Sequence, residues 1–304
     1  MMNNTITAIK GIRVGHYTDK EAKTGCTAVI FDNGAVVGVD VRGSAPGTRE
    51  TDLLRGCNAV EKINCIMLSG GSAFGLDAAS GAMEYLEKNG VGMDTGYAKV
   101  PIVPSAVIYD LGIGRSDVRP TKENGFEACK NATDAPVESA CVGAATGATL
   151  GKCLGQESAF KSKIGSSCIE LEGGVKVAAL MIVNALGDVY NPDDGSLLAA
   201  AKINGEFVPC FNPQLMAKAA FGNTTIGIVA TNAALSREEA NKLASMAHDG
   251  MAMAIRPVHT MMDGDTVFAA STGEIENYPL MPILVAAVKA TSMAIVDAVS
   301  DVNE

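Results

Sequence analysis

One loop-to-strand junction organises this chain: Phe221-Gly222-Asn223-Thr224-Thr225, which continues as Ile226-Gly227-Ile228-Val229-Ala230-Thr231-Asn232. Upstream, Asn212-Pro213 predicts a short helix that ends near Phe221, because Asn caps helices and Pro fits their first turn. The Gly-Asn pair then breaks the helix, since both residues tolerate backbone angles that others avoid. The β-branched run that follows is typical of a buried strand. Thr224 therefore lies at the mouth of a strand.

Thr224 in this position has two interpretations. The plain one is a strand residue, because Thr favours strands, and the local pattern alone favours it. The chemical one is a nucleophile. A threonine hydroxyl is weak until a base removes its proton, and a Thr that begins a chain can use its own α-amine, with a pKa of about 8, as that base. Here this mechanism requires cleavage of the Asn223–Thr224 peptide bond.

The segment from Asn223 to Ala233 is one of several that together resemble a known family; the others lie before and after it in the chain. They are Gly11–His16, Thr24–Thr27, Arg42–Leu53, Gly70–Ala79 and Met262–Asp265. In this order, and over nearly the whole chain, the sequence resembles the self-processing aminopeptidases. That family includes the L-aminopeptidase/D-amidase/D-esterases, the β-aminopeptidases and the nylon-oligomer endo-hydrolases, which are N-terminal-nucleophile hydrolases in the wide sense. The resemblance implies that Thr224 is the nucleophile.

The resemblance also implies a fold and a maturation route. The expected fold is α+β, a four-layer αββα sandwich that forms a single hydrolase domain over residues 1–304. Self-cleavage after Asn223 would divide it into an α chain, 1–223, and a β chain, 224–304. The resemblance also implies a homo-oligomer, which is a tetramer in this family. It implies no metal and no organic cofactor.

Asn184 is the first candidate beside the nucleophile. It follows a strand predicted over residues 174–183, and as a plain residue it would cap its own strand end. Amide hydrolysis, however, needs a donor aimed at the developing oxyanion. The sequence Val183-Asn184-Ala185-Leu186-Gly187 ahead of the nucleophile resembles the family pattern, which implies that role for the Asn184 side chain.

Asp263-Gly264-Asp265 places two carboxylates two residues apart at the entrance of another predicted strand. Asp-Gly favours a β-turn, which is the plain interpretation. A carboxylate near the Thr224 amine would instead hold that amine and raise its pKa. The β-aminopeptidase branch of the family has Ser-Gly-Glu at this position, whereas Asp-Gly-Asp is similar to the nylon-oligomer branch. The Asn223-Thr224 pair at the expected cleavage site is also similar to that branch.

Two further candidates depend on the resemblance. Lys152 would ordinarily be a solvated surface charge, but its segment Gly147-Ala148-Thr149-Leu150-Gly151-Lys152 is similar to the family segment whose Lys lies near the nucleophile. Such a Lys can stabilise charge or relay a proton if burial lowers its pKa. Tyr109 matches a family position that contacts the active site and is expected to bind substrate; otherwise it is a core tyrosine.

Composition narrows the class of protein. Hydrophobic residues make up 47% of the 304 residues and aromatic residues only 5%, so the core must be aliphatic. A net charge of -10 argues against nucleic-acid binding, which usually needs a basic face. We see no signal peptide and expect a cytoplasmic protein, whose eight Cys, without zinc or Cys-x-x-Cys spacing, remain free thiols. Residues 281–299 are expected to form a core helix and not a membrane span.

Local patterns predict further elements. Asp32-Asn33-Gly34 between two β-branched runs, residues 24–31 and 35–41, indicates a hairpin. The polar loop Arg42–Asp52 is either plain surface or part of the substrate pocket. A strand over Asn64–Leu68 leads through Ser69-Gly70-Gly71-Ser72, which fits neither a nucleophile elbow nor a dinucleotide fingerprint, into a helix over 73–88. Further expectations are a strand-like segment 101–111, a helix over 125–131, a turn at Asp193-Asp194-Gly195, a capped helix from Ser236 to about 255 and a strand over 265–270.

These observations lead to one functional hypothesis with alternatives. The chain is expected to be an autoprocessed amide hydrolase, an aminopeptidase or amidase acting on small peptides, small amides or amide oligomers. One alternative is an acyltransferase of the ornithine acetyltransferase type, which has the same fold and a Thr nucleophile. Another is a binding protein that is never processed, and a remote one is a serine hydrolase that uses Ser72.

Overall fold

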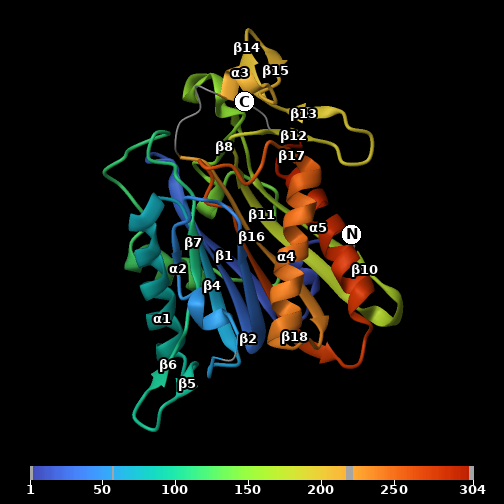
Figure 1. The fold of residues 1–304 in the computed structure, drawn as a ribbon. Helices are drawn as coiled ribbons and strands as arrows, with labels where there is room; N and C mark the ends of the chain where they lie inside the picture. Colours follow the sequence, from blue (N-terminus) through green and yellow to red (C-terminus); the bar gives the residue numbers. More distant parts are fainter. Residues whose placement is uncertain (1–2, 57, 217–221, 301–304) are drawn as a thin grey trace.

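Two β-sheets lie between two layers of helices in the computed structural model, which describes residues 3–56, 58–216 and 222–300 (Figure 1). Helices α1 (Ala78–Lys88) and α2 (Lys122–Lys130) cover the outer face of one sheet. Helices α4 (Arg237–Ala254) and α5 (Leu280–Asp297) cover the outer face of the other. This arrangement confirms the four-layer αββα sandwich.

One long strand, β2 (Thr24–Val41), belongs to both sheets. Its first half joins the first sheet, with β1 (Ile12–Asp19), β3 (Thr48–Arg49), β4 (Ile63–Ser69) and β7 (Ser105–Val107). Its second half joins the second sheet, with β10 (Ile164–Glu170), β11 (Lys176–Asn184), β16 (Thr224–Ala233) and β18 (Thr266–Ile275). Short strands complete the description: β5 (Met93–Asp94), β6 (Lys99–Val100), β8 (Thr149–Leu150), β9 (Phe160–Lys161), β12 (Asp188–Tyr190), β13 (Leu197–Ala199), β14 (Ala201–Ile203), β15 (Glu206–Val208) and β17 (Ile255–Arg256).

Alternating side chains divide the interior into three aliphatic cores, because successive residues of a strand point to opposite faces. In β16, Ile226 and Ile228 face the space between the two sheets, whereas Val229 faces α4 and α5. The third core lies between the first sheet and α1 and α2, where Ala28 and Met67 pack. Both faces of β16 are therefore covered, and all ten of its residues are buried.

The predicted hairpin at Asp32-Asn33-Gly34 is wrong, because β2 runs straight through it. Residues 24–31 already have β1 on one edge and β4 on the other, so no edge is left for residues 35–41 to fold back on. These residues pair instead with β18, in the second sheet. The extra residues form an irregularity between Ile30 and Ala35, where Gly34 adopts a φ of 71°, a value that favours glycine.

Most other predicted elements are present with shifted bounds. The strand-like segment 101–111 contains only the short β7, and the helix near 125–131 begins earlier, as α2 at Lys122. A 3-10 turn, Ser72–Asp77, precedes α1, and residues 193–195 form a turn. Ser236 caps α4 in a capping box with Glu239, as predicted. Helix α3 covers Pro213–Met216, and its predicted end near Phe221 lies outside the described residues.

Helix α5 is long and apolar enough to cross a membrane by composition alone, and it is the only such helix among the described residues. Half of it is buried in the protein, where it packs against β10, β11 and α4. These contacts support the expectation of a core helix.

Thr224 is the first residue of β16, the strand that connects the whole second sheet. β16 pairs antiparallel with β11 and parallel with β18, and β18 in turn pairs with β2. The two strands that follow the Asn223–Thr224 bond, β16 and β18, therefore lie in the sheet between β11 and β2, which precede it. A chain cut before Thr224 would keep both pieces in the same hydrogen-bonded layer.

Candidate active site

The loop-to-strand junction is held in one conformation by close packing. Gly222 has a φ of 115°, and a Cβ there would lie 2.8 Å from the ring of Tyr109. Only glycine meets both constraints without strain. Asn223 and Thr224, which follow it, are 3% and 5% exposed. The bond between them is thus enclosed, and the Thr224 side chain has little freedom.

The Thr224 hydroxyl lies against the carbonyl group of the preceding residue. Its Oγ1 donates a hydrogen bond to the Asn223 carbonyl oxygen, which also accepts the Gly264 N–H at 3.0 Å. A Cβ on Gly264 would lie 2.9 Å from Thr224 Oγ1 and 2.7 Å from the Ala45 oxygen. A hydroxyl, a carbonyl and a backbone donor therefore meet at one peptide bond. The sequence singled out the carboxylates on either side of Gly264 but not Gly264 itself.

Asn184 lies opposite Thr224 in the pairing of β11 with β16 and is fully buried. Its Nδ2 donates to the carbonyl oxygens of Tyr109, at 3.1 Å, and Gly222, at 3.3 Å. Its Oδ1 accepts the Thr149 N–H at 3.1 Å, which fixes the orientation of the amide. The side-chain N–H therefore points toward the junction.

The Lys152 amine converges on the same place. It donates to Asn184 Oδ1 at 2.7 Å, to the Asn184 carbonyl at 3.0 Å and to the Gly222 carbonyl at 3.2 Å. Desolvation lowers the pKa of Lys152 to about 7, against the opposing effect of the negative charges of Asp263 and Asp110. An amine of this kind can exchange protons near neutral pH.

The two carboxylates of the Asp-Gly-Asp segment have different surroundings. Asp265 accepts the Thr225 N–H at 2.6 Å with one oxygen and binds His259 with the other. Asp263 accepts the Thr260 N–H at 2.9 Å and the Thr260 hydroxyl. Burial, and then the charge of Asp265, raises the pKa of Asp263 to about 6. His259 was not among the residues singled out from the sequence, because its contact with Asp265 arises from a loop without a recognisable motif.

A cavity of about 220 Å³ opens beside Thr224. Its lining residues include Tyr109 and three residues of the predicted pocket loop: Ala45, Pro46 and Gly47. The structure thus brings the sequence-predicted residues Thr224, Asn184, Lys152, Asp263, Asp265 and Tyr109 to one site, where their roles remain predictions. Ser72 also lines the cavity, but its hydroxyl makes no hydrogen bond to a titratable side chain in the part of the chain described.

The described residues contain no group of three or more His, Cys, Asp and Glu side chains arranged to hold a metal ion. Asn184, Lys152, Asp263 and Asp265 instead make hydrogen bonds to one another, to neighbouring side chains and to the backbone. The side chains brought together here supply a hydroxyl, an amide, an amine, an imidazole and two carboxylates.

The chain is similar to known proteins over nearly its whole length. The model of "Peptidase family S58" matches residues 4–303. An "uncharacterized aminopeptidase" of Mycobacterium tuberculosis (strain ATCC 25618 / H37Rv) is 45% identical over 294 residues, covering 90% of this chain and 82% of the relative. A 6-aminohexanoate-oligomer endohydrolase of Kocuria sp. (strain KY2) is 31% identical over 285 residues, covering 88% and 74%.

A solved structure shows the same fold. The L-aminopeptidase D-Ala-esterase/amidase from Ochrobactrum anthropi, described as a variant of the Ntn hydrolase fold, superposes with a TM-score of 0.72. The alignment covers 97% of this chain and 85% of that one, at 19% identity. The expected family and fold are both confirmed by these comparisons.

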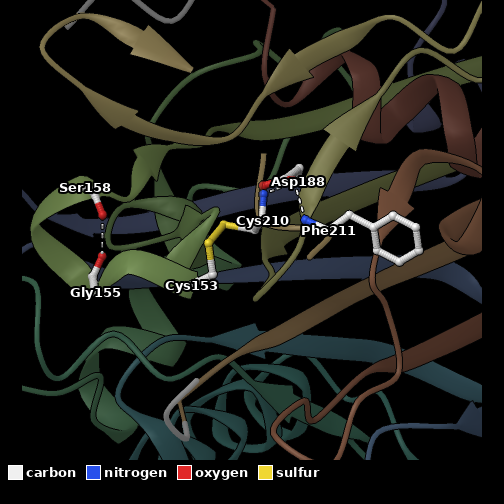
Figure 2. The surroundings of a disulfide bond; sticks show 6 residues. All are labelled: Cys153, Gly155, Ser158, Asp188, Cys210 and Phe211. Atoms are coloured by element: carbon white, nitrogen blue, oxygen red, sulfur yellow. Dashed lines mark hydrogen bonds between the residues drawn. A yellow bond between two sulfur atoms is a disulfide. The ribbon is translucent and has the colours of Figure 1, made fainter. Parts of the chain in front are cut away.

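A disulfide between Cys153 and Cys210 lies next to Lys152 in the sequence (Figure 2). It corrects the expectation that all cysteines are free thiols, although Cys26, Cys65 and Cys129 are free and buried. No spacing motif indicated the bond, because its partners are 57 residues apart. Asp188 also holds the backbone at Cys210, because its carboxylate accepts the N–H groups of Cys210, at 2.6 Å, and Phe211, at 3.3 Å. The disulfide thereby links the segment that carries Lys152 to the segment that leads to Thr224.

Removing the disulfide should destabilise the protein and loosen the site. We expect Cys153→Ser to lower the free energy of unfolding by about 4 kcal/mol for a loop of this length, measured by denaturant unfolding in a Thr224→Ala background. Cys168→Ser, at a free and half-buried cysteine, is the control. Peptide mapping without reductant should find Cys153 linked to Cys210, and its failure to do so would contradict the assignment.

Proposed function

The chain belongs to peptidase family S58 and is a hydrolase of amide bonds, and we propose that it cuts itself between Asn223 and Thr224. Thr224 then serves as the N-terminal nucleophile. One observation carries this proposal: the Thr224 hydroxyl is hydrogen-bonded to the Asn223 carbonyl oxygen, which also accepts the Gly264 N–H. The reacting hydroxyl and a donor for the developing charge are therefore in place before any substrate binds.

Self-cleavage begins with attack of the Thr224 Oγ1 on the Asn223 carbonyl carbon. The Gly264 N–H stabilises the negative charge on the Asn223 oxygen, as an oxyanion-hole donor does. The Asn223–Thr224 C–N bond breaks as an ester forms, and the Thr224 nitrogen gains a proton to become a free amine. Water then hydrolyses the ester and leaves Asn223 as a carboxylate.

Lys152 is the base that we assign to the first step. Its amine contacts the Gly222 carbonyl, one residue before the bond that breaks, and its pKa of about 7 allows it to accept a proton at neutral pH. It can later return that proton to the leaving nitrogen. The nearby charge of Asp263 stabilises the protonated form.

Turnover reuses the same groups once the new end at Asn223 has moved aside. The Asn184 Nδ2 and Lys152 Nζ donors, which bind the Gly222 carbonyl in the uncut chain, then face the space for a substrate carbonyl. Asn184 stabilises the oxyanion while the free Thr224 amine acts as general base. The hydroxyl attacks the amide, an amine leaves, and water releases the acyl group.

The size of the cavity limits the substrate. About 220 Å³ beside Thr224 accommodates a short acyl group, which supports small peptides, small amides or amide oligomers as substrates. The proposal further includes a homo-oligomer, a tetramer. Met281, Val285 and Met293, exposed along one face of α5, support association with another copy.

Turnover should depend on Thr224 and Asn184 when short amides of α-, β- and ω-amino acids are tested. We expect Thr224→Val to abolish amine release and Asn184→Ala to lower kcat by about 10²- to 10³-fold in the processed enzyme, because one oxyanion donor is lost. Asn33→Ala, at an exposed asparagine of β2, is the control. Acyl transfer from acetylornithine to glutamate without net hydrolysis would point instead to an acyltransferase.

Self-cleavage should accelerate as the pH rises through about 7, where the Lys152 amine loses its proton. Below that pH the protonated amine cannot accept the Thr224 proton. Lys152→Arg should remain protonated and should process at least about 100-fold more slowly, whereas the exposed Lys161→Arg should not differ from wild type. Time courses of the uncut fraction from about pH 5 to about pH 9 test this. A flat profile, or normal processing of Lys152→Arg, contradicts the assignment of Lys152 as the base.

A further inference from the structure

Two adjacent residues, His259 and Thr260, hold both carboxylates of the site. Each of them binds one carboxylate with its backbone N–H and its side chain together. His259 uses its N–H, at 3.0 Å, and its Nδ1, at 2.8 Å, on Asp265 Oδ2. Thr260 uses its N–H and hydroxyl on Asp263 Oδ2. One short loop therefore orients the two carboxylates that flank Gly264.

Asp265 transmits this contact to the nucleophile. Its Oδ1 accepts the Thr225 N–H at 2.6 Å, and this N–H belongs to the peptide that directly follows Thr224. Asp265 is 1% exposed, so water does not compete for these bonds. The path His259–Asp265–Thr225 consequently fixes the backbone on the carboxyl side of the Thr224 hydroxyl.

The backbone conformation and surroundings of His259 are consistent with a side chain whose role is the hydrogen bond to Asp265. Its φ of 56° lies in the left-handed region, which residues other than glycine adopt infrequently, although histidine, asparagine and aspartate are found there more often than most. Its buried Nε2 has no hydrogen-bond partner in the described part of the chain, and its ring packs edge-on against His248, at 4.7 Å between centroids. We assign the proton to Nδ1, because a carboxylate oxygen is the acceptor there and Nε2 faces none.

Resting on the proposed function, we propose that His259 is a positioning residue: it holds Asp265 so that the Thr224 hydroxyl stays aligned with the carbonyl that it attacks. Asp265 is engaged at both oxygens by main-chain and His259 donors. Asp263 instead acts through its charge, which stabilises the protonated form of Lys152. The two carboxylates thus have separate tasks, one of orientation and one of charge.

Two substitutions at His259 separate the effect of its side-chain hydrogen bond to Asp265 from the effect of its backbone conformation. Asn tolerates a positive φ, and its Nδ2 takes the place of the His Nδ1, whereas Gly tolerates the backbone but has no donor. We expect His259→Asn to self-cleave within about threefold of wild type and His259→Gly to be slowed about tenfold or more, as the loss of a hydrogen bond to a charged group predicts. In processed enzyme, His259→Gly should lower kcat and leave KM unchanged. Asn277→Gly, at an exposed residue with a φ of 58°, is the backbone control.

The outcomes separate this inference from the function on which it rests. If wild type cleaves and His259→Gly cleaves equally fast, or if His259→Asn is as slow as His259→Gly, the positioning role is wrong while the proposed function stands. If wild type never cleaves, both fail. Nitrogen-15 spectra of the three histidines in the Thr224→Ala precursor need no substitution at 259. They should show a low-field Nδ1 proton on His259, and its absence overturns the proposal even if His259→Gly does not fold.

Discussion

The hydrogen bond from the Thr224 hydroxyl to the Asn223 carbonyl is the centre of the site, and strand pairing brings the other groups to it. β11 places Asn184 opposite Thr224, and the strand bridge between Asn223 and Asp263 places Gly264 at the same carbonyl. A slip of one residue in either pairing would turn the Thr224 side chain to the other face of the sheet. The site is therefore a consequence of sheet register, and the loops add the cavity around it.

Burial is what makes that register definite. β16 is covered on both faces, by aliphatic residues of the facing sheet and by α4 and α5, so a change of register would disrupt close packing on both faces at once. The same burial places Asn184 and Lys152 in surroundings where their hydrogen bonds gain strength and where the pKa of Lys152 falls. Because β16 and β18 lie in the sheet between β11 and β2, which precede Thr224, a cut at this bond would leave both pieces in one hydrogen-bonded layer.

Runs of β-branched and apolar residues and a capping box were enough to predict β16, β11 and α4, because burial and capping leave direct traces in the sequence. The roles of Asn184, Lys152 and Asp263 came from resemblance, since each residue alone has a plainer interpretation. The hairpin at Asp32-Asn33-Gly34 was mispredicted because a turn motif does not reveal that both edges of the first half of β2 are already paired. The Cys153–Cys210 bond and the His259–Asp265 contact depend on how distant or irregular segments fold, which a single sequence does not encode locally.

The central claim, that Thr224 becomes an N-terminal nucleophile, is tested most directly by the intact mass of the purified protein under denaturing conditions, beside a Thr224→Ala variant. By proportion of 223 and 81 residues to the 304-residue chain of 31.2 kDa, the account predicts pieces of about 23 and about 8 kDa from wild type only. Both cysteines of the disulfide precede Asn223, so the pieces separate without reductant. A wild-type chain that stays whole after prolonged incubation, or a Thr224→Ala chain that is cut at the same bond, would contradict the account.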